Sequence, residues 1–214
     1  IASKNKVTRQ DVFRLTVEMI PLKYLPGGIW HMASRVLHLR SKGVENRLLA
    51  LTTLFEVLLP ALVSTVVAIG LFFLNLVFAP KIGYVEVIII YTAIFFTAIL
   101  MFNYGATGKR NVLVSIVLHW VNVAMLFGCW FSIFNTPGLI LIENMVNYLL
   151  SWAVGNLAFF APQGVAVTEG VFLLLDTSTS LSTMMVALVG FRMLLMIGDV
   201  SILFCWLLIR KWLS

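Results

Sequence analysis

Residues 48–78 read LLALTTLFEVLLPALVSTVVAIGLFFLNLVF, an almost unbroken apolar run that decides the fold class. About 20 such residues are enough for a helix to cross the hydrocarbon core of a bilayer. The run is continuous rather than alternating in polarity, which indicates a helix and not a strand of a transmembrane barrel. It is longer than one crossing needs, so we expect this helix to tilt, to bend at Pro60, or to extend beyond the lipid.

Similar apolar runs recur along the chain, at residues 84–102, 112–134, 139–160 and 181–209. Of all residues, 61% are hydrophobic and 11% are charged, and the mean hydropathy is +1.01. A soluble domain is about half apolar and about a quarter charged. The sequence therefore predicts an all-α integral membrane protein, a polytopic helical bundle that forms a single transmembrane domain over residues 1–214.

Residues 1–47 are polar to amphipathic and precede the first apolar run. A helix lying at the membrane surface is expected over residues 8–20. The segment KYLPGGIWH, at 23–31, contains a proline followed by two glycines, so the chain should leave the helix there. A second helix should then run over residues 29–42.

The basic residues are concentrated in three places. Nine of the fifteen lysines and arginines lie within residues 1–47, two lie at 109–110, and two lie at 210–211. The positive-inside rule places such regions in the cytoplasm. Anionic lipid headgroups rather than nucleic acid explain the net charge of +6.

A second break, APQGVAVTEG, covers residues 161–170. In the topology above, the apolar runs on either side of it cross the membrane in the same direction, so the chain between them must return. That segment holds too few apolar residues for an ordinary span, which predicts a broken or re-entrant helix over residues 165–175. Irregular backbone at that depth is tolerated only where protein or a wet cavity covers it.

The two breaks share a proline and a glycine ahead of an apolar helix. They consist of Pro26, Gly27 and Gly28 in the first, and of Pro162, Gln163 and Gly164 in the second. Paired breaks are typical of an inverted repeat around a midplane binding site. A helix that begins inside the membrane presents free N–H groups, which suit an anion such as a phosphate approaching the glycines. The alternative is that both segments are turns that bind nothing.

Basic residues accompany the first break. Four of them share one helical face: His31, Arg35, His38 and Lys42. Together with Lys23 they are candidates to guide a lipid phosphate to the break, and Arg35 is the strongest of the four. The alternative is an interfacial helix whose basic side chains only reach toward headgroups, which we favour for His38 and Lys42.

Five charged residues lie in or against apolar runs: Glu56, Glu143, Glu169, Arg192 and Asp199. Each is costly in lipid unless it is paired or hydrated. Arg192 and Asp199 are two turns apart, too far for direct contact, so Arg192 needs a partner on another helix and Glu169 is the expected one. Glu56, Glu143 and Asp199 are candidates for gating or ion coupling. The alternative is that such charges only fix helix packing.

Several stretches resemble the lysylphosphatidylglycerol synthase transmembrane-region family. They are KYLPGGIWHMASRV at 23–36, LFE ending at Glu56, FFAPQGVAVTEGVFLLL at 159–175, and GFRMLL at 190–195 with Arg192. The family pattern favours glycine where this chain has Gln163. The family includes flippase-like proteins often associated with glycosyltransferases, and the membrane half of the multiple-peptide-resistance factor.

The resemblance implies a bacterial or archaeal cytoplasmic-membrane protein with further spans ahead of Ile1. It also implies a translocase that moves an anionic phospholipid or a lipid-linked sugar phosphate between leaflets. The rivals are a polyprenyl-phosphate-dependent transferase with Glu56 or Glu169 as base, and a membrane scaffold for a glycosyltransferase. The sequence contains no nucleotide loop, metal-ligand spacing or catalytic serine motif, so we expect no catalytic residue, metal or cofactor. The expected partner is a membrane lipid, with a homo-oligomer left open.

Both chain ends are expected to face the cytoplasm, because basic residues cluster near each of them. The test is labelling of single cysteines placed at Ser3 and at Ser214, in a variant that lacks Cys129 and Cys205. A membrane-impermeant reagent should label neither site from outside intact cells. Labelling of either site from outside would contradict this topology.

Overall fold

The computed structural model describes residues 9–25, 30–78, 109–134, 140–158, 161–176 and 179–213. Throughout these ranges the secondary structure is helical, without a strand, which confirms the all-α fold class. The α-helices are α1 (Arg9–Glu18), α2 (Trp30–Ser41), α3 (Asn46–Phe78), α5 (Lys109–Phe131), α6 (Ile140–Leu157), α7 (Val167–Leu175) and α8 (Leu181–Leu213). Two short 3-10 helices, η1 (Ile20–Tyr24) and η2 (Pro162–Gly164), mark the breaks. The expected run at 84–102 and the residues Pro26, Gly27 and Gly28 lie outside the described ranges.

Three helices are long and apolar enough to cross a membrane, judged by their length and composition. The stretches are Asn46–Val77 in α3, Leu113–Phe131 in α5 and Leu181–Arg210 in α8. Helix α6, expected from its apolar run to be a further span, is not among these three. Its 18 residues include Glu143 and three asparagines.

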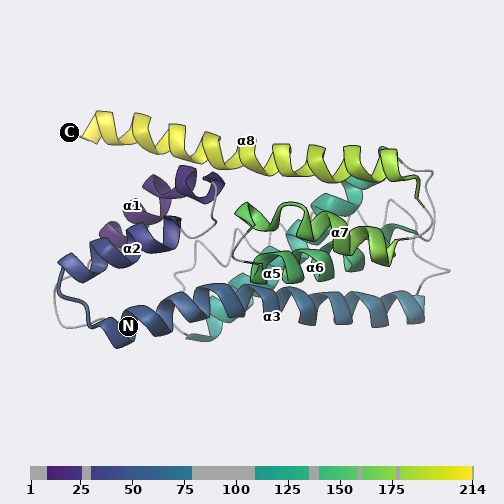
Figure 1. Ribbon diagram of the computed structural model, residues 1–214, viewed down its shortest axis with the longest axis horizontal. Helices are drawn as coiled ribbons and strands as arrows, with labels where there is room; N and C mark the ends of the chain where they lie inside the picture. Colours follow the sequence, from purple (N-terminus) through teal and green to yellow (C-terminus); the bar gives the residue numbers. More distant parts are fainter. Residues whose placement is uncertain are drawn as a thin grey trace.

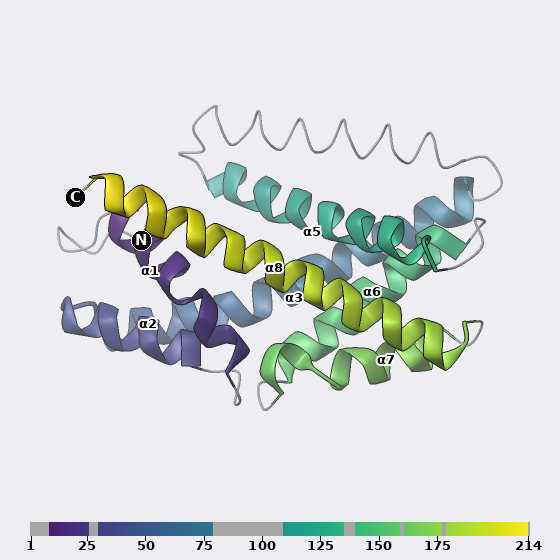
Figure 2. The ribbon, with the colours of Figure 1, turned by 90° about the horizontal axis from the view of Figure 1, so that it is seen from above.

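The longest helices, α3 and α8, lie on opposite sides of the molecule (Figure 1). Helices α1 and α2 lie between them at one end, and α6 and α7 lie between them at the other. Viewed from above, α8 crosses over the other helices at an oblique angle, and α5 flanks the bundle (Figure 2). The first break, at η1, therefore lies near the second, at η2, although most of the chain separates them in sequence.

Helix α6 is the central element of the bundle. It packs against α3, α5 and α7, and an unbroken stretch of it, residues 144–149, is buried. On the buried face of α3, the small residues Ala61, Ser64 and Ala68 let the two backbones approach closely. Polar residues of α6 are thereby covered by protein rather than by lipid.

Helix α3 continues through Pro60. A proline inside a helix removes a backbone donor and disturbs the hydrogen bonds of the preceding turn. The side chain of Asn156 in α6 donates from Nδ2 to the carbonyl oxygen of Val57, three residues before the proline, at 2.8 Å. This bond fixes α3 against α6 within the turn before the proline.

Aromatic rings join four helices in the core. The fully buried ring of Phe127 in α5 stacks on Tyr148 of α6 with a centroid distance of 4.1 Å. It also meets the edges of Phe172 in α7 and Phe191 in α8, at 5.7 and 5.2 Å. Such ring pairs contribute about 0.5–1.5 kcal/mol each beyond the area they bury. Phe127 is thus the residue on which the packing of α5 to α8 converges.

The amphipathic N-terminal helices form where the sequence predicts them. Helix α1 buries Leu15 and Val17, and α2 begins at Trp30. Lys42 at the end of α2 contacts Asp11 of α1 at 2.8 Å, so this lysine ties the two helices together. Exposed pairs of this kind contribute little to stability, about 0–1 kcal/mol.

Replacing Phe127 with alanine should lower the free energy of unfolding by about 3 kcal/mol, because the ring leaves a cavity where four helices meet. Phe73→Ala is the matched control, since the Phe73 side chain lies 60% exposed on α3. Thermal or denaturant unfolding in detergent measures both variants. Equal effects would show that the four helices do not depend on this ring.

Candidate binding site at the two helix breaks

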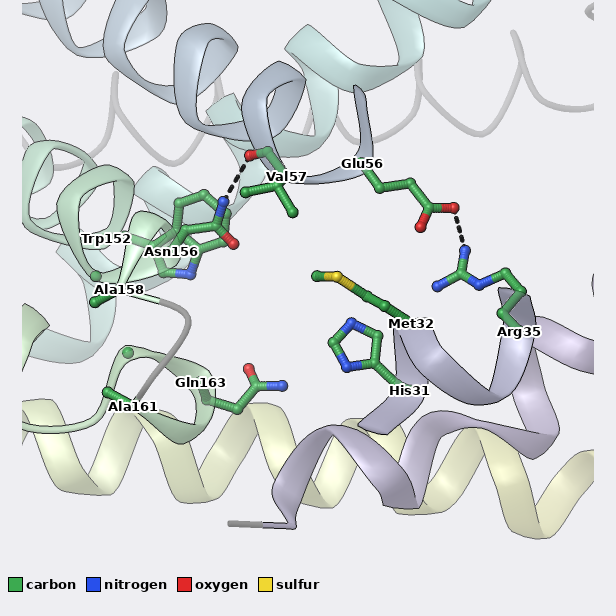
Figure 3. Close-up of a pocket in the computed structure, with 12 residues that line it drawn as sticks. His31, Met32, Arg35, Glu56, Val57, Trp152, Asn156, Ala158, Ala161 and Gln163 are labelled. Carbon is green, nitrogen blue, oxygen red and sulfur yellow. Dashed lines mark hydrogen bonds and ion pairs between the residues drawn. The ribbon is translucent and has the colours of Figure 1, made fainter. Parts of the chain in front are cut away.

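A cavity of about 450 Å³ lies between α2, α3, α6 and the second break (Figure 3). Helix α2 contributes His31, Met32 and Arg35 to its wall. Glu56 and Val57 come from α3, Trp152, Gly155 and Asn156 from α6, and Gln163 and Gly164 from η2. Figure 3 shows the Gln163 amide pointing toward His31 across the cavity. We call this space the polar cavity, because cationic, acidic and amide side chains meet in it.

Arg35 and Glu56 form an ion pair in the wall of the polar cavity. The guanidinium donates from Nη1 to one carboxylate oxygen, as the dashed line in Figure 3 marks. Its Nε is buried and has no hydrogen-bond acceptor among the described residues. A guanidinium binds a carboxylate or a phosphate best through two parallel bonds. The contact with Glu56 therefore leaves part of the donor capacity of Arg35 unused.

The first break is held by Asp199 of α8. Lys23 of η1 forms an ion pair with this carboxylate, and the Tyr24 hydroxyl donates a hydrogen bond to it. Burial, and then the hydrogen bond to Asp199, raise the pKa of the Tyr24 hydroxyl above its ordinary value, so it remains a neutral donor. Lys23 thus contacts α8 and does not line the polar cavity. Asp199, expected to be a gating residue, anchors η1 to the last helix.

The second break takes its shape from residues in the left-handed backbone region. Gln163 has φ 53° and ψ 23°, Gly164 has φ 64° and Ala166 has φ 68°. Glycine adopts this region freely, whereas other residues are strained there by about 1 kcal/mol or more. The expected break is therefore present, and the helix that follows it begins at Val167. A left-handed position also explains why a glycine would suit position 163.

Arg192 of α8 stabilises this strained segment through an ion pair and hydrogen bonds. Its Nε contacts Oε1 of Glu169 at 2.6 Å, and its Nη2 donates to Oε2 at 3.3 Å, which confirms the expected ion pair. The same guanidinium donates to the carbonyl oxygens of Gln163 and Gly164, at 3.2 and 3.4 Å. All three of its nitrogens thus have acceptors, and Glu169 is only 6% exposed. We conclude that this pair holds the break in place.

Gly164 is required for packing rather than for leaving space open. A side-chain carbon added there would lie 2.6 Å from the backbone carbon and oxygen of Gly155 in α6. A carbon added at Gly155 would lie 2.1 Å from the Thr168 hydroxyl oxygen in α7. The backbone of α6 thus occupies the space on the Cβ side of Gly164, while Gly164 itself lines the polar cavity, and its role in binding a headgroup stays a prediction.

Gln163 connects the two breaks. Its Nε2 donates to the carbonyl oxygen of Lys23 at 3.3 Å. With Trp152 it also lines a second cavity of about 290 Å³, bounded by η1, α6, α7 and α8. The two cavities therefore share a wall made of these two side chains. Lys23, Gln163 and Arg192 were all expected near a site, and the structure brings them together around this wall.

Other expected site residues lie elsewhere. Glu143 is exposed in the first turn of α6 and lines neither cavity. His38 is exposed on α2 and, like Lys42, lies outside the polar cavity. This agrees with the weaker role that the sequence gives to these two residues. Within the described ranges, no three His, Cys, Asp or Glu side chains are grouped as metal ligands would be.

Among the residues of the site that were not predicted, Tyr24, Asn156 and Trp152 make its notable contacts or its shared wall. Tyr24 belongs to the quoted first-break motif but carries no charge that would have singled it out. Asn156 is one of three asparagines in an apolar run. An asparagine in such a run indicates a hydrogen bond to another helix, but the sequence does not identify the acceptor. Trp152 has no distinguishing signal, because an aromatic residue in a membrane helix is ordinary.

Comparisons with protein-family models, curated proteins and solved structures found no match for this chain. The resemblance to the lysylphosphatidylglycerol synthase transmembrane-region family therefore stays a prediction from the quoted motifs.

Arg192→Gln and Glu169→Gln should each lower the free energy of unfolding, the first by about 3 kcal/mol because it leaves the buried Glu169 without a partner, and the second by less because Arg192 is only partly buried. Arg192→Gln should be the more damaging, since it also removes donors from two carbonyls of the break. The double variant should be less unstable than the sum of the two. Strict additivity in thermal unfolding would show that the two side chains do not interact. Arg14→Gln, which removes an exposed pair with Glu18, is the control, expected to change stability by about 0.5 kcal/mol.

Gly164→Ala should destabilise the protein by about 2 kcal/mol, because its new carbon meets the Gly155 backbone at a positive φ. Gly170→Ala is the matched control in α7, where a side-chain carbon meets nothing within 4 Å. That variant should be neutral or slightly stabilising, as alanine favours helix. Thermal unfolding compares them. Indistinguishable melting temperatures would rule out the packing role of Gly164.

Proposed function

We propose that this protein is a membrane lipid translocase, which moves an anionic phospholipid or a lipid-linked sugar phosphate between leaflets. The observation that carries the proposal is the Arg35–Glu56 pair, which lies in the wall of a cavity beside a membrane-spanning helix. An ionisable pair in such a place is costly and indicates a functional site or a substrate path.

The depth of this pair supports a headgroup site within the bilayer. Glu56 lies ten residues after the start of the apolar stretch Asn46–Val77. At about 1.5 Å per residue, this is about 15 Å along a stretch about 48 Å long, so a hydrocarbon core about 30 Å thick and centred on the stretch would enclose Glu56 about 6 Å below its surface. A headgroup bound there would be in transit between the two surfaces.

In the proposed mechanism, a lipid phosphate displaces Glu56 from Arg35. The phosphate oxygens accept from Nε, which lacks a partner, and from Nη2 on the same side of the guanidinium, which gives the bidentate contact that Glu56 does not make. When the headgroup leaves, Glu56 forms its ion pair with Arg35 again, so that no unpaired cation remains in the cavity. The amide of Gln163 is available to sugar or glycerol hydroxyls at the opposite wall. Movement is downhill or coupled to an ion.

The proposal also places both chain ends in the cytoplasm and the two breaks as halves of an inverted repeat. The contact between η1 and η2 supports this arrangement, since midplane sites of repeat-built transporters form where two broken helices meet. The family resemblance points to the same class of substrate. The transferase alternative would require Glu56 or Glu169 as a free base, and both carboxylates are engaged by arginines.

Arg35→Gln should slow lipid exchange at least tenfold, because the cavity loses the cation that binds the phosphate. The assay uses purified protein in vesicles that contain fluorescent phosphatidylglycerol, with a membrane-impermeant reductant quenching the outer leaflet. Arg40→Gln is the matched control, because Arg40 is exposed on α2 outside the polar cavity. Equal exchange rates for the two variants, or none above protein-free vesicles for the wild type, would reject the proposal.

A further inference from the structure

The second cavity is mainly apolar, in contrast to the first. Its wall includes Tyr148 of α6, Val165 beyond the second break, and Val189, Met193, Leu195 and Met196 of α8. Its two charged members, Glu169 and Arg192, are bound to each other and to the break. The cavity therefore offers an apolar surface with no unmatched charge.

This cavity lies halfway along a membrane-spanning helix. The apolar stretch of α8 covers Leu181–Arg210, and the lining residues of α8 are at 189–196. At about 1.5 Å per residue they lie about 12–22 Å from the start of the helix, where the surrounding solvent is hydrocarbon. Val189 and Met193 are 43% and 53% exposed, so this wall also forms part of the outer surface of α8. A hydrocarbon chain can reach the cavity from there.

The two cavities adjoin. Trp152 and Gln163 line both of them, so the apolar cavity begins where the polar cavity ends. A molecule with a charged head and an apolar chain matches this order of surfaces. The flexible, polarisable side chains of Met193 and Met196 adapt to chains of different shape.

We infer that the second cavity is a chain-binding subsite, which holds a hydrocarbon chain of the lipid whose phosphate binds at Arg35. This inference rests on the proposed function and adds to it the recognition of the chain. The occupant is a membrane lipid chain because the cavity opens at mid-span and joins the phosphate site. Headgroup and chain then bind together, and the chain remains shielded from the polar cavity while the headgroup crosses.

The test compares two ligands in phosphatidylcholine nanodiscs. Glycerol phosphate carries the headgroup without a chain, and decanoyl lysophosphatidylglycerol carries one chain. Wild-type protein should bind the chain-bearing ligand at least tenfold more tightly. Met193→Trp fills the subsite, so it should lose this advantage and keep its affinity for glycerol phosphate. Val200→Trp, at a 54% exposed position of α8 outside the cavity, should behave like the wild type.

Val189→Phe serves as a second filling variant in case Met193→Trp does not fold. If the filled variants still bound decanoyl lysophosphatidylglycerol more tightly than glycerol phosphate, the proposed subsite would be wrong, since the chain would then lie elsewhere. An equal loss in Val200→Trp would overturn it as well, because the effect would come from the outer surface of α8. Failure of wild-type protein to bind glycerol phosphate would refute the headgroup site. A chain-dependent affinity that only the filling variants remove would still support the subsite in that case.

Discussion

The arrangement of the protein depends on satisfying backbone carbonyls at a helix break that sits among membrane helices. Lipid provides no donors, so every broken turn needs protein partners. Arg192 supplies them for the second break by binding the carbonyls of Gln163 and Gly164 and the carboxylate of Glu169 at once. Because Arg192 belongs to α8, this single guanidinium also sets where the last helix lies against α7.

The contacts of Arg192 with the second break also determine where the two cavities lie. Gly164 packs directly on Gly155, which brings η2 against α6 and directs Gln163 toward η1. The polar cavity is the space left between this corner and helices α2 and α3. Asp199 closes the other side by binding Lys23 and Tyr24, so α8 holds both breaks with two charged residues. The two arginines therefore differ. All three nitrogens of Arg192 have acceptors, whereas Nε of Arg35 has none among the described residues.

Some of the site could be predicted because it follows from the cost of charge in lipid. Arg192 had no partner within its own helix, and Glu169 was the nearest carboxylate to the second break, so their pairing followed. The pairing of Arg35 with Glu56 was not predicted, because Arg35 was treated as a candidate for substrate binding and Glu56 as a separate candidate for gating or ion coupling. Gly164 was assigned to the headgroup because a glycine in sequence does not show which backbone will approach it. Glu143, like Glu56, is a glutamate within an apolar run. The sequence does not show that the orientation of α6 leaves its side chain exposed.

The sequence by itself determined the all-helical class, the presence of helices long and apolar enough to cross a membrane, the positions of α1, α2, α3, α5 and α8, and the existence of the second break. These are local properties, since apolar run length, proline and glycine act through the residues beside them. Only the tertiary structure decided that Arg35 meets Glu56 and that Lys23 meets Asp199, that α6 is a covered central helix, and that two unlike cavities share one wall. Tyr24 and Asp199 are 175 residues apart, and Asn156 and Val57 are 99 apart. Contacts over such separations depend on how whole helices pack, which no local pattern of residues encodes.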